Sequence, residues 1–409
     1  MTPQPHIVVL GSGFAAIRFA REASRLPVKI TLVSPRNHFL FTPLLPSTTV
    51  GTVEFRSVIE AVRTACPDIE YVMAEAVGLN TETQILNCQS PQDHRAFTLS
   101  YDELVISVGA KTQTFGIEGV SDYALFLKEV KDAKAIRQRL LDNLESASIP
   151  GVSESEKKRL LHVVVVGGGP TGVEFAAELN DFLARDIRKA YGELAKDMRI
   201  TLIEAGQELL GSFDDALSAY TLKHFQRQAI EVMTGARVTR VEQDRLWLKS
   251  GLEIAYGLLV WATGNSPSDF VSGLPFTKDR EGRIRVNGHL QVIDVKNVFA
   301  LGDCSSLEIP LPGTGQVAEQ QGRYLAKSLA TRLRGQTPAP FKFNNHGMLA
   351  YIGDRHALVE TASIKSHGFL TFLFWRSVYL TKLVSLRNKV LVLFDWARTA
   401  IFGRDLSRT

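Results

Sequence analysis

The chain has 409 residues, of which 45% are hydrophobic, and a formal net charge of +4. This length and apolar content suffice for more than one hydrophobic core, so we expect two or three domains. Three cysteines far apart in the sequence argue against a disulfide framework and a cysteine-based zinc site, and the uncharged apolar stretches are shorter than a membrane span.

The excess positive charge lies at the end of the chain. Residues 366–409 carry a net charge of +5, and the rest of the chain sums to −1. We therefore expect no nucleic-acid-binding surface on the body of the protein.

A glycine-rich loop follows the first apolar run. His6–Leu10 predicts a parallel strand, and a helix is expected over about Phe14–Arg25. Between them Gly11 permits a tight turn and Gly13 lets the backbone approach a pyrophosphate, which the helix N-terminus also attracts.

The strand after this loop, Lys29–Val33, does not end in the acid that normally binds a ribose. It ends in Ser34, which can still hydrogen-bond a ribose, and Arg36 can cover an adenine or a phosphate. Without the acid, a glycine turn that binds no ligand remains an alternative for this loop alone.

A second and more complete glycine loop follows Leu161–Val166. Gly167, Gly169 and Gly172 occupy all three positions of the dinucleotide fingerprint, with Pro170 and Thr171 between them. Glu174–Leu179 predicts a helix, which continues into a charged helical stretch over about Asn180–Lys196.

Glu204 ends the next predicted strand, Ile200–Ile203. A carboxylate there accepts hydrogen bonds from both ribose hydroxyls of NADH and repels the 2′-phosphate of NADPH. A solvated surface acid is the alternative. Two unequal loops suggest a resident flavin on the first and an exchangeable nicotinamide on the second, with the flavin carrying the redox chemistry.

Three further strand-and-turn segments support this division. Tyr101–Ala110, with Gly109 in its turn, is similar to Leu258–Asn265, which ends in Gly264 and Asn265; two copies of one nucleotide-binding unit would show such a repeat. Asn297–Cys304 delivers Asp303 into a turn, where its carboxylate can accept from ribityl hydroxyls or cap a helix.

These motifs occur in the order found in one flavoprotein family. Together with Asn37–Pro46 (Asn-His-Phe-Leu-Phe-Thr-Pro-Leu-Leu-Pro), they make the chain resemble a type II NADH:quinone oxidoreductase, the single-subunit NADH dehydrogenase that does not pump protons. The likeness covers essentially the whole chain, and Asn37–Pro46 and the tail are its most selective parts.

The resemblance implies the roles of individual residues. Non-covalent FAD would lie along the first loop, and NADH would be the substrate of the second. The implied FAD residues are Gly11, Gly13, Phe14, Ala15, Ser34, Arg36, Thr42, Leu44, Gly109, Asp303, Gln316 and Val317. The implied NADH residues are Gly167, Gly169, Pro170, Thr171, Gly172, Glu174, Glu204, Gly264 and Asn265. No calcium-loop pattern occurs, and we expect no metal site.

A quinone site is expected on the helix predicted within Pro312–Ala326. Gln316 and Gln320 are four residues apart and share one face. By resemblance they would donate hydrogen bonds to ubiquinone, menaquinone or plastoquinone, and Gly315 stands where the family usually has Ala. An ordinary amphipathic helix face is the alternative.

Two apolar helices with basic rims are expected in the tail, over Phe369–Leu386 and Val390–Phe402. Such faces suit a monotopic anchor on an anionic membrane, although they would also suit packing on the body or in a homodimer. Lys382 could help protonate the reduced quinone, or simply extend its amine to water.

The predicted fold is α/β, with two Rossmann-type, three-layer domains and a C-terminal helical region. The FAD-binding domain would comprise residues 1–115 and 270–330, and the NADH-binding domain residues 116–269. The C-terminal region with the membrane-anchor helices would comprise residues 331–409. The expected reaction is a ping-pong transfer from NADH to quinone, with Glu174, Gln316 and Gln320 as catalytic residues. The polar start of the chain predicts no leader, hence a peripheral protein on the cytoplasmic face of a bacterial membrane.

Two alternatives share these cofactors. An apoptosis-inducing-factor-like protein would use the flavin and NADH for signalling, and a sulfide:quinone oxidoreductase would need reactive cysteines near the flavin. A disulfide reductase is disfavoured because no CxxC occurs, and a ferredoxin reductase would not need the apolar, basic tail.

Overall fold

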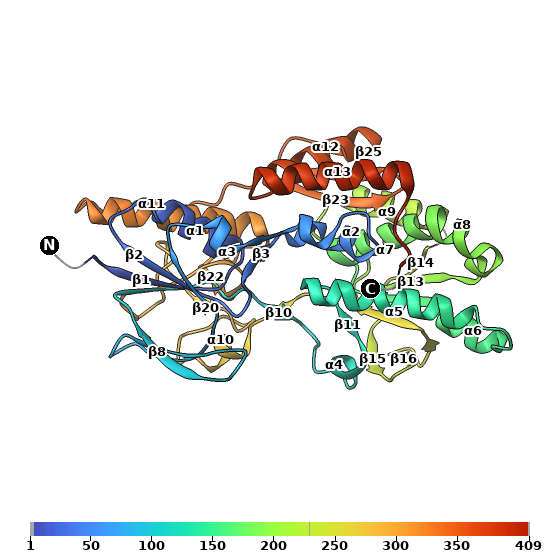
Figure 1. The fold of residues 1–409 in the computed structure, drawn as a ribbon, viewed down its shortest axis with the longest axis horizontal. Coiled ribbons are helices and arrows are strands. Elements are labelled where there is room, and N and C mark those ends of the chain that lie inside the picture. Colours follow the sequence, from blue (N-terminus) through green and yellow to red (C-terminus); the bar gives the residue numbers. More distant parts are fainter. Residues whose placement is uncertain (1–3, 229, 408–409) are drawn as a thin grey trace. The chain divides into compact units, whose positions relative to one another are not determined.

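The computed structural model describes residues 4–228 and 230–407 (Figure 1). The chain divides into two compact units. The first unit contains Met1–Leu40, Ile59–Lys111 and Asn265–Asn344. The second unit contains Phe41–Val58, Thr112–Gly264 and Asn345–Thr409.

The first unit is built on a five-stranded parallel sheet. Its strands, in spatial order, are β21 (Val298–Ala300), β9 (Glu103–Ile106), β1 (His6–Leu10), β2 (Lys29–Val33) and β5 (Glu70–Val72). Val8 and Val9 of the central strand are completely buried, as expected when both faces of a parallel sheet are covered.

Helices and smaller sheets complete the first unit. Helices α1 (Phe14–Ala23) and α11 (Gly315–Leu333) pack side by side in Figure 1. The remaining elements are α3 (Val62–Ala65), α10 (Asp269–Gly273), the pair β3 (His38–Leu40) and β4 (Ile59–Ala61), the sheet β6 (Glu75–Asn80), β7 (Ile85–Gln89) and β8 (Ala96–Ser100), and the pair β20 (Ile284–Arg285) and β22 (Ser305–Ser306).

The second unit repeats this architecture. Its parallel sheet contains, in order, β11 (Leu125–Phe126), β18 (Leu258–Trp261), β12 (His162–Val166), β13 (Arg199–Ile203) and β14 (Ile230–Met233). In each unit the strand before the glycine loop is central and the next strand in sequence is its neighbour. This correspondence bears out the internal repeat expected from the sequence.

The helices of the second unit include one long helical stretch. Helix α7 (Pro170–Phe182) continues through a π turn (Leu183–Ile187) into α8 (Arg188–Tyr191), as the charged segment predicted. The others are α2 (Leu45–Thr49), α4 (Val120–Tyr123), α5 (Val130–Ala147), α6 (Glu154–Leu160), α9 (Asp215–Arg227), α12 (Phe369–Lys382) and α13 (Leu386–Phe402), and a small sheet comprises β15 (Val238–Val241), β16 (Arg245–Leu248) and β17 (Glu253–Ala255).

The tail differs from the predicted helical region. An antiparallel sheet precedes its helices, with strands β23 (Met348–Gly353), β24 (His356–Glu360) and β25 (Lys365–Gly368). The first tail helix also ends at Lys382 rather than Leu386, because Ser385 caps the next helix by accepting the Asn388 N–H at 3.2 Å.

The compact units also divide the chain differently from the predicted domains. Residues 41–58 belong to the second unit because α2 packs on α5 and α7, and the hydroxyls of Ser47 and Thr52 bond to Glu178 of α7. Residues 331–344 belong to the first unit.

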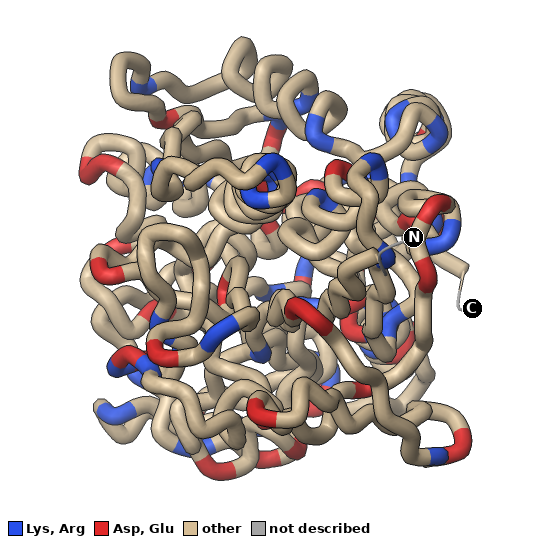
Figure 2. Tube along the Cα trace, turned by 90° about the vertical axis from the view of Figure 1, so that its left-hand side faces the viewer, with Lys and Arg blue, Asp and Glu red and all other residues tan. Residues whose placement is uncertain are grey.

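Within the described residues no helix is both long and apolar enough to span a bilayer. Figure 2 shows Lys and Arg interspersed with Asp and Glu along the chain.

Candidate functional site

The two glycine turns have the same geometry. Gly11 and Gly167 have φ of +105° and +116°, a region that favours glycine. A Cβ at Gly11 would lie 2.2 Å from the Ser107 carbonyl oxygen, and one at Gly167 would lie 2.4 Å from that of Ala262. The first glycine of each loop is therefore required by both conformation and space.

The other loop glycines fall into two kinds. A Cβ at Gly13, Gly169, Gly109 or Gly264 would meet no protein atom within 4 Å. This open backbone fits the close approach of a pyrophosphate in both units. A Cβ at Gly172, in contrast, would lie 1.9 Å from the Gly167 carbonyl oxygen, so this glycine allows α7 to pack on its own loop. Pro170 and Thr171 begin α7, where the helix N-terminus favours an anion.

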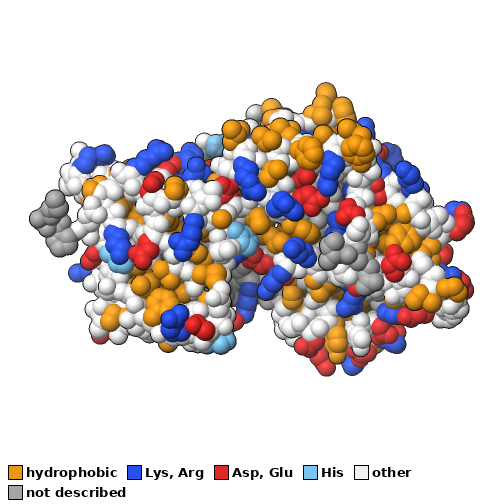
Figure 3. Space-filling model, in the orientation of Figure 1, with side chains coloured by type: hydrophobic (Ala, Val, Ile, Leu, Met, Phe, Trp, Pro, Cys, Tyr) orange, Lys and Arg blue, Asp and Glu red, His pale blue; other side chains and the backbone are white. Residues whose placement is uncertain are grey.

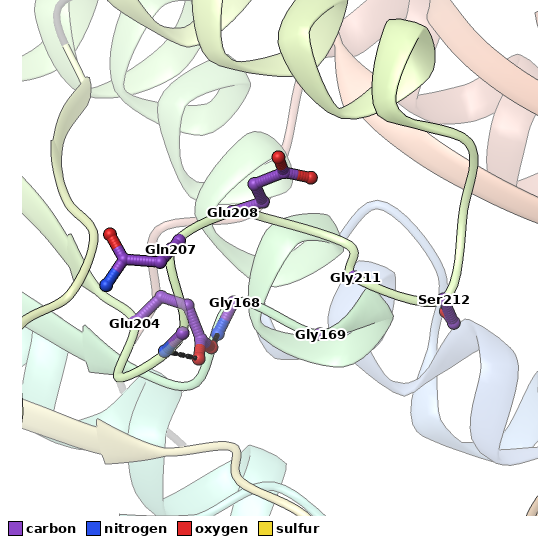
Figure 4. A pocket seen from close by; sticks show the side chains of 8 residues that line it. Gly168, Gly169, Glu204, Gln207, Glu208, Gly211 and Ser212 are labelled. Atoms are coloured by element: carbon purple, nitrogen blue, oxygen red, sulfur yellow. Dashed lines mark hydrogen bonds between the residues drawn. The ribbon is translucent and has the colours of Figure 1, made fainter.

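A pocket in the second unit opens beside the second loop (Figure 4). Glu204 is directed at the loop, and its carboxylate accepts N–H groups from Gly168 at 2.6 Å and Gly206 at 2.5 Å. Gln207, Glu208 and Ser212 also line this pocket. None of these three residues was expected from the sequence, because an irregular segment after a strand carries no periodic signal.

The corresponding strand end of the first unit is uncharged. Ser34 is buried, donates to the Ser12 hydroxyl at 3.1 Å and accepts the Arg36 N–H at 3.2 Å. The Arg36 side chain donates to the carbonyl oxygen of His38 at 3.0 Å. Serine and arginine thus form one local network where the second unit has a single carboxylate.

Asp303 lies in a single 3₁₀ turn of the first unit. The side-chain amide of Gln321 accepts the Gly302 N–H at 2.6 Å and fixes this turn to α11. The Asn265 amide donates to the Asp303 carboxylate at 3.3 Å. Asn265, which was expected beside NADH, therefore lies with the expected flavin residues, because the chain has entered the first unit at this position.

Helix α11 begins over the ring of Phe14. A Cβ at Gly315 would lie 3.2 Å from three atoms of that ring, so an alanine here would press on it. Thr314 caps the helix by accepting the Val317 N–H at 3.3 Å. Ala15 and Val317 are buried, so they can contribute backbone groups or apolar contact rather than polar side chains.

The two glutamines of α11 share one face, as predicted, but have unequal partners. The Gln320 amide donates to the Asn344 carbonyl oxygen at 2.8 Å and accepts the Asn344 N–H at 2.9 Å. This paired bond ties α11 to the segment that follows it. The Gln320 amide is thus held by the backbone of Asn344 and also donates to the Gln316 side-chain oxygen at 3.5 Å.

Three acidic residues face the interior of the second unit from α7. Glu174, Glu178 and Asp181 follow at four- and three-residue spacing and are each about 95% buried. Glu174 accepts the Tyr351 N–H at 3.0 Å and the Tyr379 hydroxyl at 3.4 Å. Burial raises the pKa of Glu174 to about 8, so it holds a proton at neutral pH.

Of these acids only Glu174 was expected from the sequence. A usable signal was present, because acids at helical spacing on a buried face need partners. Asp181 accepts the Tyr351 hydroxyl, and Glu178 accepts the hydroxyls of Ser47 and Thr52 at 2.6 and 2.7 Å.

The other predicted site residues of the second unit are Thr42, Leu44 and Lys382. Thr42 and Leu44 form a 3₁₀ turn, in which Thr42 is exposed and Leu44 is buried. Lys382 is the exposed last residue of α12.

The tail helices present an apolar surface. Figure 3 shows hydrophobic side chains gathered over α12 and α13, with basic side chains beside them. The large apolar residues at least 45% exposed on these helices, which we call the tail surface, are Phe369, Leu370, Leu373, Phe374, Leu386, Val390, Leu393, Phe394, Ile401 and Phe402. Other tail residues face inward: Asp395 accepts the Ser57 hydroxyl at 2.6 Å.

Family models cover most of the chain. Residues 5–322 match the pyridine nucleotide-disulphide oxidoreductase family, and residues 346–405 match the NDH2 C-terminal domain. The three-stranded sheet and the two tail helices thus form a known domain together.

Individual relatives extend over nearly the whole chain. A probable NADH dehydrogenase of Dictyostelium discoideum is 43% identical over 98% of this chain and 90% of that protein. An internal alternative NAD(P)H-ubiquinone oxidoreductase of Arabidopsis thaliana, described as mitochondrial, is 42% identical over 99% of this chain and 86% of that protein.

Solved structures agree with these relatives. NDH2 from Plasmodium falciparum, solved in complex with NADH, superposes with a TM-score of 0.95 at 27% identity, covering 99% of this chain and all of that one. A sulfide:quinone oxidoreductase of Aquifex aeolicus shares the fold, with a TM-score of 0.75 at 19% identity. The chain therefore belongs to the type II NADH:quinone oxidoreductases, a flavin-dependent branch of the pyridine nucleotide-disulphide oxidoreductase family.

Proposed function

We propose that the first unit holds FAD non-covalently and that the second unit receives NADH. The duplicated glycine turn is the observation that carries this proposal, because its two copies differ at the strand end: Ser34 in one unit and Glu204 in the other. A carboxylate placed by two backbone N–H groups suits the paired hydroxyls of an exchangeable nucleotide.

A bound flavin supplies the two-electron redox chemistry of the reaction NADH + H⁺ + quinone → NAD⁺ + quinol. In the first unit Asp303, fixed through Gly302 and Gln321, offers carboxylate oxygens to ribityl hydroxyls. Phe14, packed edge-on against Phe39 with ring centroids 5.0 Å apart, supports the start of α1 from the apolar side.

The proposed acceptor is a membrane quinone. Several relatives are named ubiquinone oxidoreductases, which favours ubiquinone over menaquinone and plastoquinone. Gln316 supplies a side-chain amide to a quinone carbonyl, with Gln320 as its support. Within the second unit, Glu174 holds one proton that can be released during turnover and regained from water, a general-acid role.

The tail surface is the proposed membrane contact. Apolar side chains with adjacent cations suit peripheral docking on anionic lipid. The homodimer and the bacterial cytoplasmic face remain predictions from the sequence, and several relatives are mitochondrial by name. Sedimentation and fractionation of native cells test these two points.

The buried cysteines speak against sulfide chemistry. Burial raises the pKa of the Cys66 and Cys304 thiols to about 12 and that of Cys88 to about 11, so none is a thiolate nucleophile. An apoptosis-inducing-factor-like role is not favoured either, because the relatives are NADH and quinone oxidoreductases.

Anaerobic stopped-flow at the flavin absorbance tests the proposal. We expect NADH to bleach the flavin faster than NADPH does, and ubiquinone in vesicles to restore the absorbance. No bleaching by NADH would refute the assignment of the two loops, and bleaching without reoxidation by any quinone would refute the acceptor.

A further inference from the structure

A single guanidinium group meets the buried acids of α7. Arg404 follows directly on the end of α13, where Gly403 has a φ of +81°. The Arg404 side chain is only 5% exposed, and it donates to Glu178 at 3.3 Å and to Asp186 at 2.9 Å. Its Nε also donates to the Thr52 hydroxyl at 2.9 Å, and its backbone N–H to Asp186 at 3.0 Å.

The two glutamates of α7 have contrasting surroundings although they are one helical turn apart. The Glu178 carboxylate accepts two hydroxyls and the Arg404 guanidinium, which are groups that stabilise a negative charge. Glu174 accepts one N–H and one phenol, from Tyr351 and Tyr379, in an aromatic setting that includes Trp375. Where the surroundings of two nearby carboxyl groups favour opposite charge states, the proton can be assigned to one of the two groups.

Without the guanidinium this separation would be lost. Glu178 would keep the Ser47 and Thr52 hydroxyls as hydrogen-bond donors but lose its guanidinium, and a buried carboxylate without a cationic partner is costly. The two neighbouring carboxyl groups would then share a proton, instead of one group holding the proton and the other the charge.

We propose that Arg404 is a positioning residue: its guanidinium pairs with the carboxylates of Glu178 and Asp186, so that of the two glutamates of α7 Glu174 is the one that takes up a proton. This rests on the proposed function only for the use of that proton in quinone reduction. Because Arg404 follows α13, the helix that carries much of the tail surface also places the charge that sets the protonation of α7.

Other charged and titratable groups face the same acids from each neighbouring element. They are Asp181 on α7, Arg185 and Asp186 in the π turn, Tyr351, Asp354 and Arg355 around the β23–β24 turn, and Arg376 and Tyr379 on α12. Arg404 differs from the other arginines in its direct hydrogen bond to Glu178.

Infrared difference spectroscopy of the purified flavoenzyme tests the assignment, because the C=O stretch of a protonated carboxyl is distinct from that of a carboxylate. The samples are the unchanged protein and the variants Glu174→Gln, Glu178→Gln, Arg404→Gln and Arg404→Gln with Glu178→Gln, each titrated with pH. We expect a protonated-carboxyl band near pH 7 that is diminished in Glu174→Gln and unchanged in Glu178→Gln. In Arg404→Gln we expect the titration to move upward by about one pH unit and a second protonated carboxyl to appear, which Glu178→Gln removes.

The opposite patterns overturn the proposal. Loss of the band in Glu178→Gln would make Glu178 the proton holder, and an Arg404→Gln titration equal to that of the unchanged protein would remove the role of Arg404. Arg404→Lys covers the case in which Arg404→Gln does not fold: one ammonium cannot span both carboxylates, so we expect a smaller rise in the same direction, and no rise overturns the proposal equally. If the proposed function is wrong but this assignment is right, the purified enzyme will not reduce quinone although these infrared bands are as expected.

Discussion

Glu204 is hydrogen-bonded to the second glycine loop: its carboxylate accepts the Gly168 N–H at 2.6 Å. A second hydrogen bond, from the Gly206 N–H, holds the other carboxylate oxygen. The negative charge at the end of β13 is therefore fixed in place by the backbone, so that it requires no rearrangement when a nucleotide binds.

Replacing this charge should relax the choice of nucleotide. We expect Glu204→Gln to raise the ratio of kcat/KM for NADPH to that for NADH by about tenfold or more, because the 2′-phosphate no longer meets a carboxylate. Glu208→Gln removes a different acid that lines the same pocket and serves as the control. A ratio unchanged in Glu204→Gln, or changed equally by both substitutions, would contradict this explanation.

Two glycines one turn apart should respond differently to alanine. In Gly172→Ala the new Cβ would lie 1.9 Å from a backbone oxygen, so we expect α7 to shift and the protein to lose about 3 kcal/mol or more of stability. In Gly169→Ala the Cβ meets no protein atom, so we expect a normal melting temperature and weaker NADH binding. Calorimetry and titration with NADH compare the two, and equal stability of both variants would refute the packing argument.

Glu174 should make stability depend on pH. Its pKa is raised from 4.5 to about 8 on folding, so between these values the folded state binds the proton more tightly than the unfolded state does. The contribution of Glu174 to stability therefore falls as pH rises through this range. Glu174→Gln removes the dependence: we expect equal melting temperatures near pH 5 and a variant that melts about 3 °C higher at pH 8. Parallel pH curves for the two proteins would contradict the raised pKa.

The tail surface should decide membrane binding. We expect Leu393→Glu with Phe394→Glu to abolish flotation with vesicles of anionic lipid, and to leave NADH oxidation by a water-soluble quinone within about twofold of normal. Val77→Glu, at a residue 54% exposed in the first unit, is the control for adding charge to exposed apolar sites. Flotation of the double variant equal to that of the control would remove the tail surface from the proposal.

The parts of the fold that sequence predicted are those with strong local patterns. The strands His6–Leu10 and Lys29–Val33 were predicted residue for residue, because continuous apolar runs between glycine turns have few other solutions. The small sheet of the tail was not predicted, although Gly353 and Asp354 between two short apolar runs are typical of a hairpin turn. In the structure Gly353, Asp354 and Arg355 all have positive φ at this turn.

The candidate site was predictable only where a motif specified it. Both glycine loops followed from their motif, Glu204 from its place at the end of a predicted strand, and the family from the order of the motifs. The pairing of Gln320 with Asn344 and of Arg404 with Glu178 did not, because these partners are 24 and 226 residues apart and no local rule links them. The basic rims expected of the tail helices did not single out Arg404, since a sequence cannot show which cations point into the protein.

The way in which the chain is divided between the two units bears on its synthesis. The first unit includes Met1–Leu40 but also Asn265–Asn344, so its parallel sheet cannot be completed until β21 has left the ribosome. The second unit in turn needs the tail. Neither unit can fold to completion on the nascent chain in the order of synthesis, so the apolar strand β9, whose outer neighbour is β21, stays unpaired on one edge for most of translation. We expect this protein to depend on chaperones more than a chain of the same length built from two consecutive domains.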